Sequence, residues 1–546
     1  MNRYLFATFL FLLCSCQDKN DKIPLQEQYH ASTKNLIPDN VLETYNCWLP
    51  EQVQNQPENT MQNNDRLSYR HTALPDEQEL FGHIALASFF LKVRNDVFVV
   101  FDYGWDIIPN ASPGRTPGNF MINESLYPAC AGRIVERLSC INDLSKKNGM
   151  KGAGVWVPIF SATHFDSASS SINSLRDYYM DRIEWSVQSG IRYWKTGFID
   201  SVDPSTLKLV VSMAQEMAPD LIIENSQHIS PLNDYACPWD TVVCQNTGTF
   251  SAWGNGLILN QAVEFAGIGL VFFTGDVTSP LYIPTTLERV AQLMIKFTMK
   301  NTSGAVVNCG DSPYMAAALG CAMQIKRHPL NYTGLDDNMD LHRKNKKFDE
   351  VIRALRWQRI APAFAIGEST VEVDAWRLKD EWVFSKNTPC DWLAGERVIQ
   401  NAPGRVSRGM PLPEVKDTTA YAYAVATRYP NAATAIATLP RTGAGSGAYH
   451  PRNDVLIMVD EWEKPIGVFG RYNSLTIKFE RLPNLIKVYG QDLAGSRAID
   501  ITEYVVINKN SLMLTGELID EVGTLAASTG DLSDPGLLIQ IEGVFK

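Results

Sequence analysis

Residues 97–106 read VFVVFDYGWD, an apolar run that ends in the carboxylate of Asp102. Similar short apolar runs recur at 154–159 (GVWVPI), 191–195 (IRYWK), 221–224 (LIIE), 241–244 (TVVC), 270–273 (LVFF) and 305–308 (AVVN). Runs of this length and composition are typical of strands that are buried on both faces of a parallel sheet. We therefore take these seven runs as the strands that decide the fold.

Segments with helical periodicity separate the runs. They lie at 77–93, 130–148, 172–189, 204–218, 286–300 and 312–324. Repeated alternation of a buried strand with a helix predicts an α/β fold, a (β/α)8 barrel over residues 40–368. A doubly wound sheet is the alternative, but it normally carries a glycine-rich phosphate turn after its first strand, and the sequence has none there.

The pattern changes after residue 368, where helical periodicity fades. Short strand-like segments bounded by turns follow at 420–426, 433–439, 455–459, 474–479, 485–489, 511–514 and 537–541. Such spacing is typical of an antiparallel β-sandwich, which we predict over residues 369–546.

The N-terminus carries an export signature. Residues 1–16 combine a positive start with an apolar stretch that is too short to span a bilayer, and they end in Leu-Cys-Ser-Cys. This ending resembles a bacterial lipobox, which implies cleavage before Cys16 and acylation of its thiol. A plain secretory signal is the alternative. We expect residues 17–39 to form a polar tether and the protein to be lipid-anchored in the cell envelope, facing the periplasm or the outer surface.

Composition narrows the ligand classes. The 49 Lys+Arg and 60 Asp+Glu give a net charge of −11, which argues against a nucleic-acid binder. Export permits disulfides, but no pairing can be deduced from the spacing of the cysteines. The sequence holds no C-x-x-C or H-x-x-x-H pair, and the calcium-like loop that begins at Asp336 has Leu341 and Lys347 at its two critical positions. We predict no metal and no cofactor.

Carboxylates follow most of the predicted strands. In a (β/α)8 barrel the reactive groups lie where the strands end, at one face. Five of the seven runs are followed there by an acid, and Trp105, Trp156, Trp194 and Trp253 lie near them in the sequence. Carboxylates accept the hydroxyl groups of sugars, and indole rings stack on sugar faces, so this composition favours a glycoside site.

These segments also resemble a known family. FDYGWD (101–106) is similar to the FDDGW-type strand end of the α-galactosidase superfamily, glycoside hydrolase families 27 and 36 of clan D. Later strand ends of that superfamily are matched in order by KGAGVWVPI (151–159), YWK (193–195), APDLIIENS (218–226) and SGAVVNCGD (303–311). The resemblance covers about residues 95–365. It implies an oligo- or polysaccharide substrate whose hydroxyls are bound by Asp102 and Lys195. With them we expect Trp105, Trp156, Asp166 and Asn246 to hold the substrate.

The reaction residues of the superfamily are not matched. Its nucleophilic Asp stands two residues after the Lys, where this chain has Gly197. The stretch expected to hold its acid/base Asp has only Asn246 and Thr249 at the plausible positions, and the second acid of its FDDGW motif is Tyr103. The resemblance therefore carries over the substrate-holding residues but not the catalytic pair.

An active enzyme would need other acids, because glycoside hydrolysis requires two carboxyl groups across the scissile bond. We predict Asp200, Glu224 and Asp276 as catalytic residues: Asp200 as the nearest replacement for position 197, and Glu224 or Asp276 as the general acid. The same residues also suit structural roles, namely a helix N-cap for Asp200, an ion pair with Lys195 for Glu224, and a turn for Asp276. His164 with Asp166 is a further candidate base.

Three functions fit the sequence. The first is an α-galactosidase-like glycosidase with a rearranged acid pair. The second is a catalytically inactive carbohydrate-binding protein of the same fold in a surface polysaccharide-utilisation system. The third is a structural partner in a polysaccharide-uptake complex, which predicts a filled barrel mouth, whereas the first two predict a pocket lined by carboxylates and tryptophan.

Overall fold

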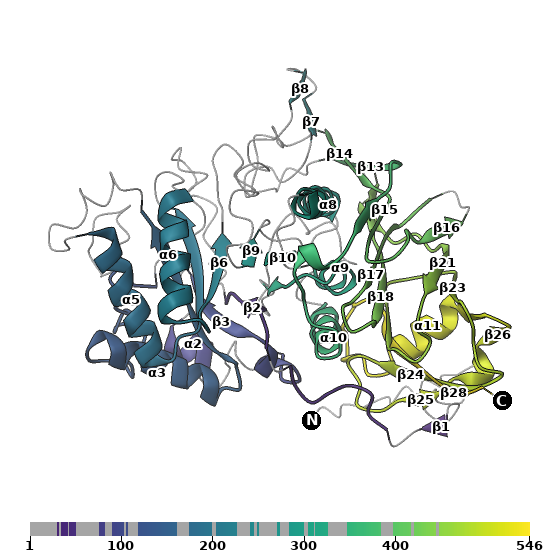
Figure 1. Cartoon of the computed structure of the whole chain (residues 1–546), viewed down its shortest axis with the longest axis horizontal. Coiled ribbons are helices and arrows are strands. Elements are labelled where there is room, and N and C mark those ends of the chain that lie inside the picture. The colour runs from purple at the N-terminus through teal and green to yellow at the C-terminus, as the bar shows by residue number, and fades with distance from the viewer. Residues whose placement is uncertain are drawn as a thin grey trace, which may run out of the picture.

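The computed structural model describes residues 30–31, 34–41, 43–50, 76–81, 90–102, 105–106, 118–160, 174–198, 204–226, 241–244, 248–250, 270–272, 283–299, 304–310, 312–325, 347–383, 397–416, 420–443 and 447–545. Within these ranges the chain is α/β, with a curved parallel sheet followed by a β-rich part (Figure 1).

The parallel sheet has the strand order β10-β9-β6-β5-β4-β3-β2-β11. Its strands are β2 (Cys47–Trp48), β3 (Phe98–Phe101), β4 (Gly152–Ile159), β5 (Tyr193–Phe198), β6 (Ile222–Ser226), β9 (Leu270–Phe272), β10 (Val306–Asn308) and β11 (Gln324–Ile325). All neighbouring pairs in this order are parallel. Six of the seven predicted runs therefore form strands of this sheet, and the very short β2 and β11 were not predicted.

Alternate residues of these strands belong to two different apolar clusters. Val99, Val155 and Trp194 lie in the large cluster that includes helix residues, whereas Val100 and Tyr193 lie in a smaller cluster with Cys47, Phe98, Val306 and Ala322. The sheet is thus apolar on both faces, as its composition predicts.

Helices cover the outside of the sheet. They are α2 (Glu77–Phe81), α3 (Ile134–Lys147), α5 (Leu175–Ser189), α6 (Pro204–Met217), α8 (Ile283–Met299), α9 (Pro313–Leu319) and α10 (Phe348–Gln358). Short 3-10 turns lie at Arg94–Asp96, at Ile366–Glu368 and, in the β-rich part, at Thr502–Tyr504. The start of α5 is set by Ser174, whose hydroxyl accepts from the backbone N–H of Asp177 at 3.1 Å, and its end by Gly190, whose φ of 74° suits glycine. Figure 1 shows α3, α5 and α6 on the side of the sheet away from the β-rich part.

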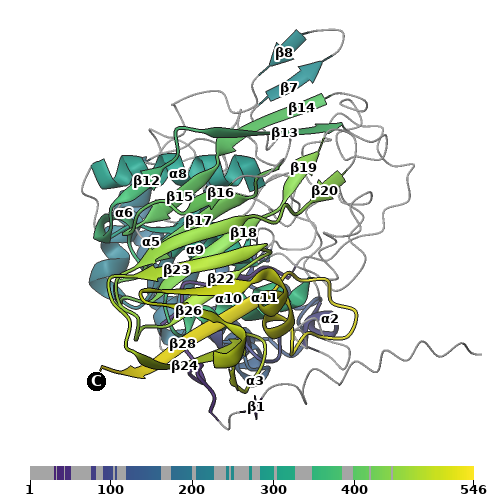
Figure 2. The same ribbon diagram turned by 90° about the vertical axis from the view of Figure 1, so that its right-hand side faces the viewer.

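One predicted strand of the barrel was wrong. β7 (Thr241–Cys244) lies in a separate antiparallel sheet of order β13-β14-β7-β8, with β8 (Gly248–Phe250), β13 (Arg377–Val383) and β14 (Arg397–Pro403). Figure 2 shows this sheet at the top of the molecule. An apolar run of four residues suits either kind of sheet, so its composition does not identify its partners.

The β-rich part contains a sheet of nine strands and a sheet of five. The first has the order β1-β25-β24-β28-β22-β18-β17-β15-β12 and the second β16-β21-β23-β27-β26. Their bounds are β1 (His30–Ala31), β12 (Val371–Val373), β15 (Arg405–Arg408), β16 (Glu414–Lys416), β17 (Tyr423–Arg428), β18 (Thr434–Leu439), β21 (Asp454–Val459), β22 (Ile466–Phe469), β23 (Ser474–Phe479), β24 (Leu485–Asp492), β25 (Ile499–Asp500), β26 (Val506–Asn508), β27 (Ser511–Thr515) and β28 (Gly536–Val544). A helix, α11 (Gly516–Gly523), and a hairpin of β19 (Arg441–Gly443) and β20 (Gly447–Tyr449) complete this part.

The prediction of an antiparallel sandwich is correct for most strand pairs of this part and wrong for three. Three pairs are parallel: β15 with β17, β18 with β22, and β21 with β23. Strand-like segments reveal their period in the sequence but not the direction of their neighbours, so the mixed pairing could not be predicted.

The nine-stranded sheet is shared between two cores. Val425 and Ala435 belong to the large cluster that includes α9 and α10, whereas Ala426 and Ile436 face the cluster formed with the five-stranded sheet. Figure 1 shows α9 and α10 on one side of β17 and β18, and β21 and β23 on the other.

The N-terminal segment before residue 40 adds to the far edge of this sheet. β1 pairs with β25, and the backbone N–H of Leu36 donates to the Gln491 side chain at 2.8 Å. His30–Ala31 and Leu36, which fall in the predicted tether, therefore contact the β-rich part; Figure 2 labels β1. Among the helices of the described ranges, none has the length and apolarity needed to cross a bilayer.

Helix α10 joins the two parts of the chain. Asp531 accepts hydrogen bonds from the backbone N–H groups of Phe348 (2.7 Å) and Asp349 (3.2 Å), and Ser533 accepts from that of Glu350 (3.0 Å). These residues satisfy donors that the first turn of a helix leaves without an internal partner. The cap of α10 thus comes from a loop about 180 residues further along the chain.

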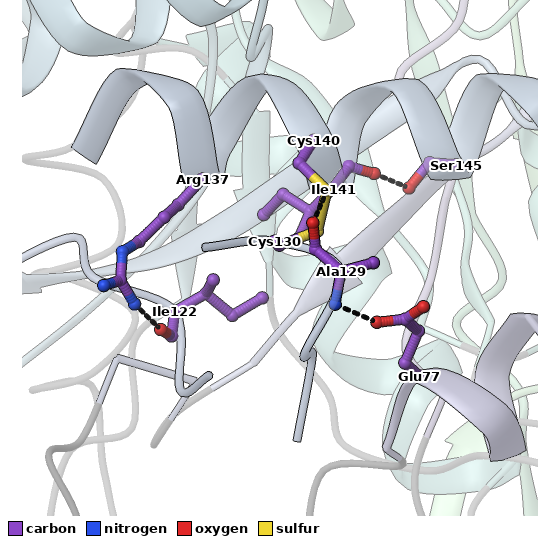
Figure 3. The surroundings of a disulfide bond; sticks show 8 residues. All are labelled: Glu77, Ile122, Ala129, Cys130, Arg137, Cys140, Ile141 and Ser145. Carbon is purple, nitrogen blue, oxygen red and sulfur yellow. Dashed lines mark hydrogen bonds between the residues drawn. A yellow bond between two sulfur atoms is a disulfide. The ribbon is translucent and has the colours of Figure 1, made fainter. Parts of the chain in front are cut away.

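A disulfide links Cys130 to Cys140, the latter on α3 (Figure 3). Next to it, the Glu77 carboxylate of α2 accepts from the backbone N–H of Ala129 at 3.0 Å. The disulfide therefore ties the loop before α3 to α3 itself, and α2 contacts the same loop through Glu77.

Removal of this disulfide is expected to lower the free energy of unfolding by about 2–3 kcal/mol, because the bond closes a loop with a sequence separation of 10. The Cys130→Ser/Cys140→Ser double variant and the wild type are compared by urea unfolding with and without dithiothreitol. The reductant should lower the free energy of unfolding of the wild type to about that of the double variant, and it should not change that of the double variant. Equal stability of the wild type and the double variant without reductant would contradict the expectation.

Candidate functional site

Asp102 directly follows β3, and Lys195 lies within β5, two strand positions away in the parallel sheet. Phe101 is paired with Val155 and Lys195 with Trp156, so Asp102, which follows Phe101, lies at the level of Lys195. The Lys195 Nζ donates to Asp102 Oδ2 at 2.7 Å. The Lys195 side chain is 2% exposed and that of Asp102 is 26% exposed, so the carboxylate is the part of this pair that a ligand can reach.

Glu224 lies beside this pair but is fully buried. Lys195 is its register partner on β5. The hydroxyl of Tyr193 donates to Glu224 Oε2, Gln324 Nε2 donates to Oε1 at 2.7 Å, and the Cys47 thiol is 3.7 Å from Oε2. The Lys195 ammonium makes its ion pair with Asp102, and hydrogen bonds from three other strands hold Glu224.

Burial raises the pKa of the Glu224 carboxyl, while Lys195 and the Tyr193 hydroxyl lower it. Burial also raises the pKa of the Cys47 thiol, and the charge of Glu224 raises it further, which keeps the thiol protonated. The arrangement therefore suits a fixed polar group inside the sheet, and the catalytic role of Glu224 stays a prediction.

Trp156 occupies the space next to Gly197. A Cβ atom added at Gly197 would lie 2.5 Å from the indole Nε1 of Trp156 and 2.8 Å from two of its ring carbons. Any side chain at position 197 would thus require the indole to move. The space beside Gly197 is therefore filled by a tryptophan from the neighbouring strand β4, and no local sequence pattern indicates this contact.

The two predicted sugar-stacking tryptophans lie in the core. Trp105 is 1% exposed and Trp156 is 5% exposed, and the Trp105 Nε1 donates to the backbone carbonyl of Trp156 at 2.8 Å. Phe120 packs edge-on against Trp105. Neither indole offers an open face in this structure, and their contact with a saccharide stays a prediction.

The other predicted site residues lie outside the described residues. These are Asp166, Asp200, Asn246, Asp276 and Cys16, together with His164. Asn246 was placed at the mouth because it follows the 241–244 run, and that reason is lost because β7 belongs to another sheet.

Asp106, four residues after Asp102, is a further buried acid that was not predicted as a site residue. It is 1% exposed, and its Oδ2 accepts from the backbone N–H of Phe120 at 3.0 Å. Its Oδ1 has no hydrogen-bond partner in the described structure. Burial raises the pKa of Asp106 to about 6, although the Phe120 N–H and the Arg182 charge lower it. The sequence feature that could have indicated Asp106 is its place as the second carboxylate of the FDYGWD motif.

No group of three or more His, Cys, Asp or Glu side chains suited to a metal ion occurs among the residues that the structure describes. The predicted lack of a metal and of a cofactor stays a prediction.

No protein-family model matches the chain. No curated protein matches it either. Among solved structures, the chain is similar to the crystal structure of a point variant of a GH27 β-L-arabinopyranosidase from Geobacillus stearothermophilus in complex with arabinose. The sequence identity is 10%, the match covers 93% of this chain and 98% of that chain, and the TM-score is 0.38. A likeness at this level assigns neither a family nor an activity to the chain.

Proposed function

We propose that this chain is an exported carbohydrate-active protein that binds a saccharide at the Asp102–Lys195 pair. The 2.7 Å ion pair between Asp102, which follows β3, and Lys195 of β5 carries the proposal; β4 separates these two strands in the parallel sheet. A carboxylate held by a buried ammonium is a rigid acceptor for hydroxyl groups, and its exposed edge faces outward. Both residues also match positions that bind sugar hydroxyls in the α-galactosidase superfamily, which the sequence resembles.

A closed (β/α)8 barrel is part of the proposal. The Ala322 N–H donates to the Val307 carbonyl at 2.9 Å and the Cys309 N–H to the Ala322 carbonyl at 3.1 Å, which joins the chain next to β11 to β10. Cys47 on β2 and Glu224 on β6 lie four strand positions apart, which is roughly 19 Å in a flat sheet. Their side chains are 3.7 Å apart, which supports a sheet that curls back on itself.

Hydrolysis by this chain would require two carboxyl groups from other positions, because residue 197 is a glycine. Two carboxyls from Asp200, Glu224 and Asp276 would have to stand about 5–10 Å apart across the bound glycosidic bond. The full burial of Glu224 favours Asp200 and Asp276 for this pair, with Glu224 as a buried acid beside Lys195. This is the glycosidase version of the proposal.

Binding without turnover is the second candidate, and the contact between Trp156 and Gly197 favours it. The space in which the superfamily carries its nucleophile holds an indole ring here. A chain that keeps the hydroxyl-binding pair and fills the nucleophile position is suited to retaining a glycan at the cell surface.

Export is supported by the Cys130–Cys140 disulfide, since such bonds persist in oxidising compartments. The lipid anchor at Cys16, in the periplasm or on the outer surface, belongs to the same proposal.

The saccharide site is tested with Asp102→Asn and Lys195→Met in the full chain. We expect each to weaken glycan binding at least tenfold, because the first removes a charged acceptor and the second releases it from its fixed position. Calorimetry against a panel of neutral and acidic oligosaccharides measures the affinity, and a sugar-release assay is run on the same panel.

Asp220→Asn, at a carboxylate whose side chain is 83% exposed, is the matched control. Release that is lost in Asp200→Asn and kept in Asn246→Ala supports the glycosidase version, and binding without release supports the second candidate. Affinities that do not change in Asp102→Asn and Lys195→Met would sink the proposed site.

A further inference from the structure

Trp376 is an exposed tryptophan on the β-rich part of the chain. It lies between β12 and β13 and is 45% exposed. Among the tryptophans whose burial the structure describes, the others are buried or partly buried. An indole is the largest apolar side chain, so its exposure at a fixed place calls for a physical reason.

The Trp376 ring is held in place by its neighbours. Tyr421 packs against it edge to face, with ring centroids 4.5 Å apart and an interplanar angle of 88°. A Cβ atom at Gly404 would be 3.4 Å from a carbon of the indole, so the ring lies close against the strand backbone there. Backbone bonds at both ends of Trp376 fix the turn, one to Asp374 Oδ1 at 2.9 Å and one from Gly404 at 3.0 Å. A ligand that stacks on this ring therefore meets a surface that is already ordered.

Two arginines adjoin Trp376 and Gly404 in the chain, and each is held in place by a carboxylate. Arg405, the neighbour of Gly404, donates from Nε to Asp374 Oδ2 at 2.6 Å, and its side chain is 28% exposed. Arg377, which follows Trp376, pairs with Glu288 and is 40% exposed. Each guanidinium has its own carboxylate, so the charges around the indole are balanced and favour a neutral ligand.

We propose that Trp376 forms a second saccharide-binding site, which binds a neutral pyranoside unit of a longer glycan. The apolar face of a pyranose stacks on an indole, and the partly exposed guanidinium groups of Arg377 and Arg405, which adjoin Trp376 and Gly404 in the chain, offer donors for its hydroxyl groups. The site shares its ligand class with the proposed function and none of its residues. A glycan bound here and at Asp102 would be held at two points, which raises the affinity for long chains over short ones.

The test is calorimetry on the full chain with mono- and hexasaccharides of glucose, galactose and mannose, and with oligogalacturonate as the acidic probe. Trp376→Ala is expected to weaken hexasaccharide binding about tenfold and to leave monosaccharide binding at the Asp102 site unchanged. Tyr504→Ala, at another aromatic residue of the β-rich part that is 38% exposed, is the matched control and should change neither. Thermal unfolding of each variant checks that the fold is retained.

The outcomes separate this site from the one at Asp102. Hexasaccharide binding that persists in Asp102→Asn and is lost in Trp376→Ala supports the Trp376 site alone. Binding that is lost in Asp102→Asn but keeps its full strength in Trp376→Ala overturns the Trp376 site alone. A Trp376-dependent preference for oligogalacturonate over every neutral glycan would also overturn the proposal as stated.

Discussion

Replacement of Arg353 by leucine is expected to lower the free energy of unfolding by about 3–5 kcal/mol. Arg353 on α10 donates from Nε and Nη2 to the two carboxylate oxygens of Asp492, at 2.9 and 3.1 Å. The side chains of the pair are 0% and 1% exposed, and Nη1 also donates to the backbone carbonyl of Asp534 at 3.1 Å. Leucine would leave the Asp492 charge buried without a counter-charge at the contact between α10 and the nine-stranded sheet. Urea unfolding followed by circular dichroism measures the loss.

Arg497→Leu, at an exposed position, is the control for the lost charge. An Arg353→Leu/Asp492→Leu double variant should recover part of the loss, because it removes the unpaired carboxylate as well. A single variant that is no less stable than Arg497→Leu would show that the pair contributes nothing to the contact.

Replacement of Asp106 by asparagine is expected to stabilise the protein at neutral pH by up to about 3 kcal/mol. Folding raises the pKa of this carboxyl from 3.8 to about 6, so the folded chain binds its proton more tightly than the unfolded chain does. Wild-type stability should therefore fall, relative to the variant, as the pH rises from about 4 to about 6, and the difference should stay constant above that. Asparagine keeps an acceptor for the Phe120 N–H and carries no charge at any of these values.

Urea unfolding at several values between pH 4 and pH 7.5 measures this difference. Asp143→Asn changes an exposed carboxylate on α3 and should give a profile parallel to that of the wild type. A difference between Asp106→Asn and the wild type that does not vary with pH would show that the carboxyl does not titrate in this range.

Much of the parallel sheet could be predicted because its strands are apolar on both faces. The runs that became β3, β4, β5, β6, β9 and β10 stand out for this reason. The strands β2 and β11 have two residues each, which is too short to form a pattern. The run at 241–244 has the right composition but pairs with Arg397–Ile399, far along the chain, and composition does not encode such a partner.

The site could be predicted only in part. Asp102 was placed there because it follows an apolar run, and Lys195 because of the family resemblance, and the two form an ion pair. The crowding of Gly197 by Trp156 and the three donors around Glu224 depend on where side chains from separate strands point. These contacts arise from tertiary packing, and no local sequence pattern reports them.

The cap that Asp531 and Ser533 place on α10 has a consequence for how the polypeptide matures. A ribosome makes residue 348 long before residue 531, so this helix emerges with its leading amides unsatisfied. Strand β18, which packs against α9, is also made after that helix. The contacts of α10 with residues 531–533 and of α9 with β18 form only late in synthesis. We therefore expect a fragment that ends at residue 368 to be less stable than the full chain. The C-terminal residues thus stabilise helices that were synthesised much earlier.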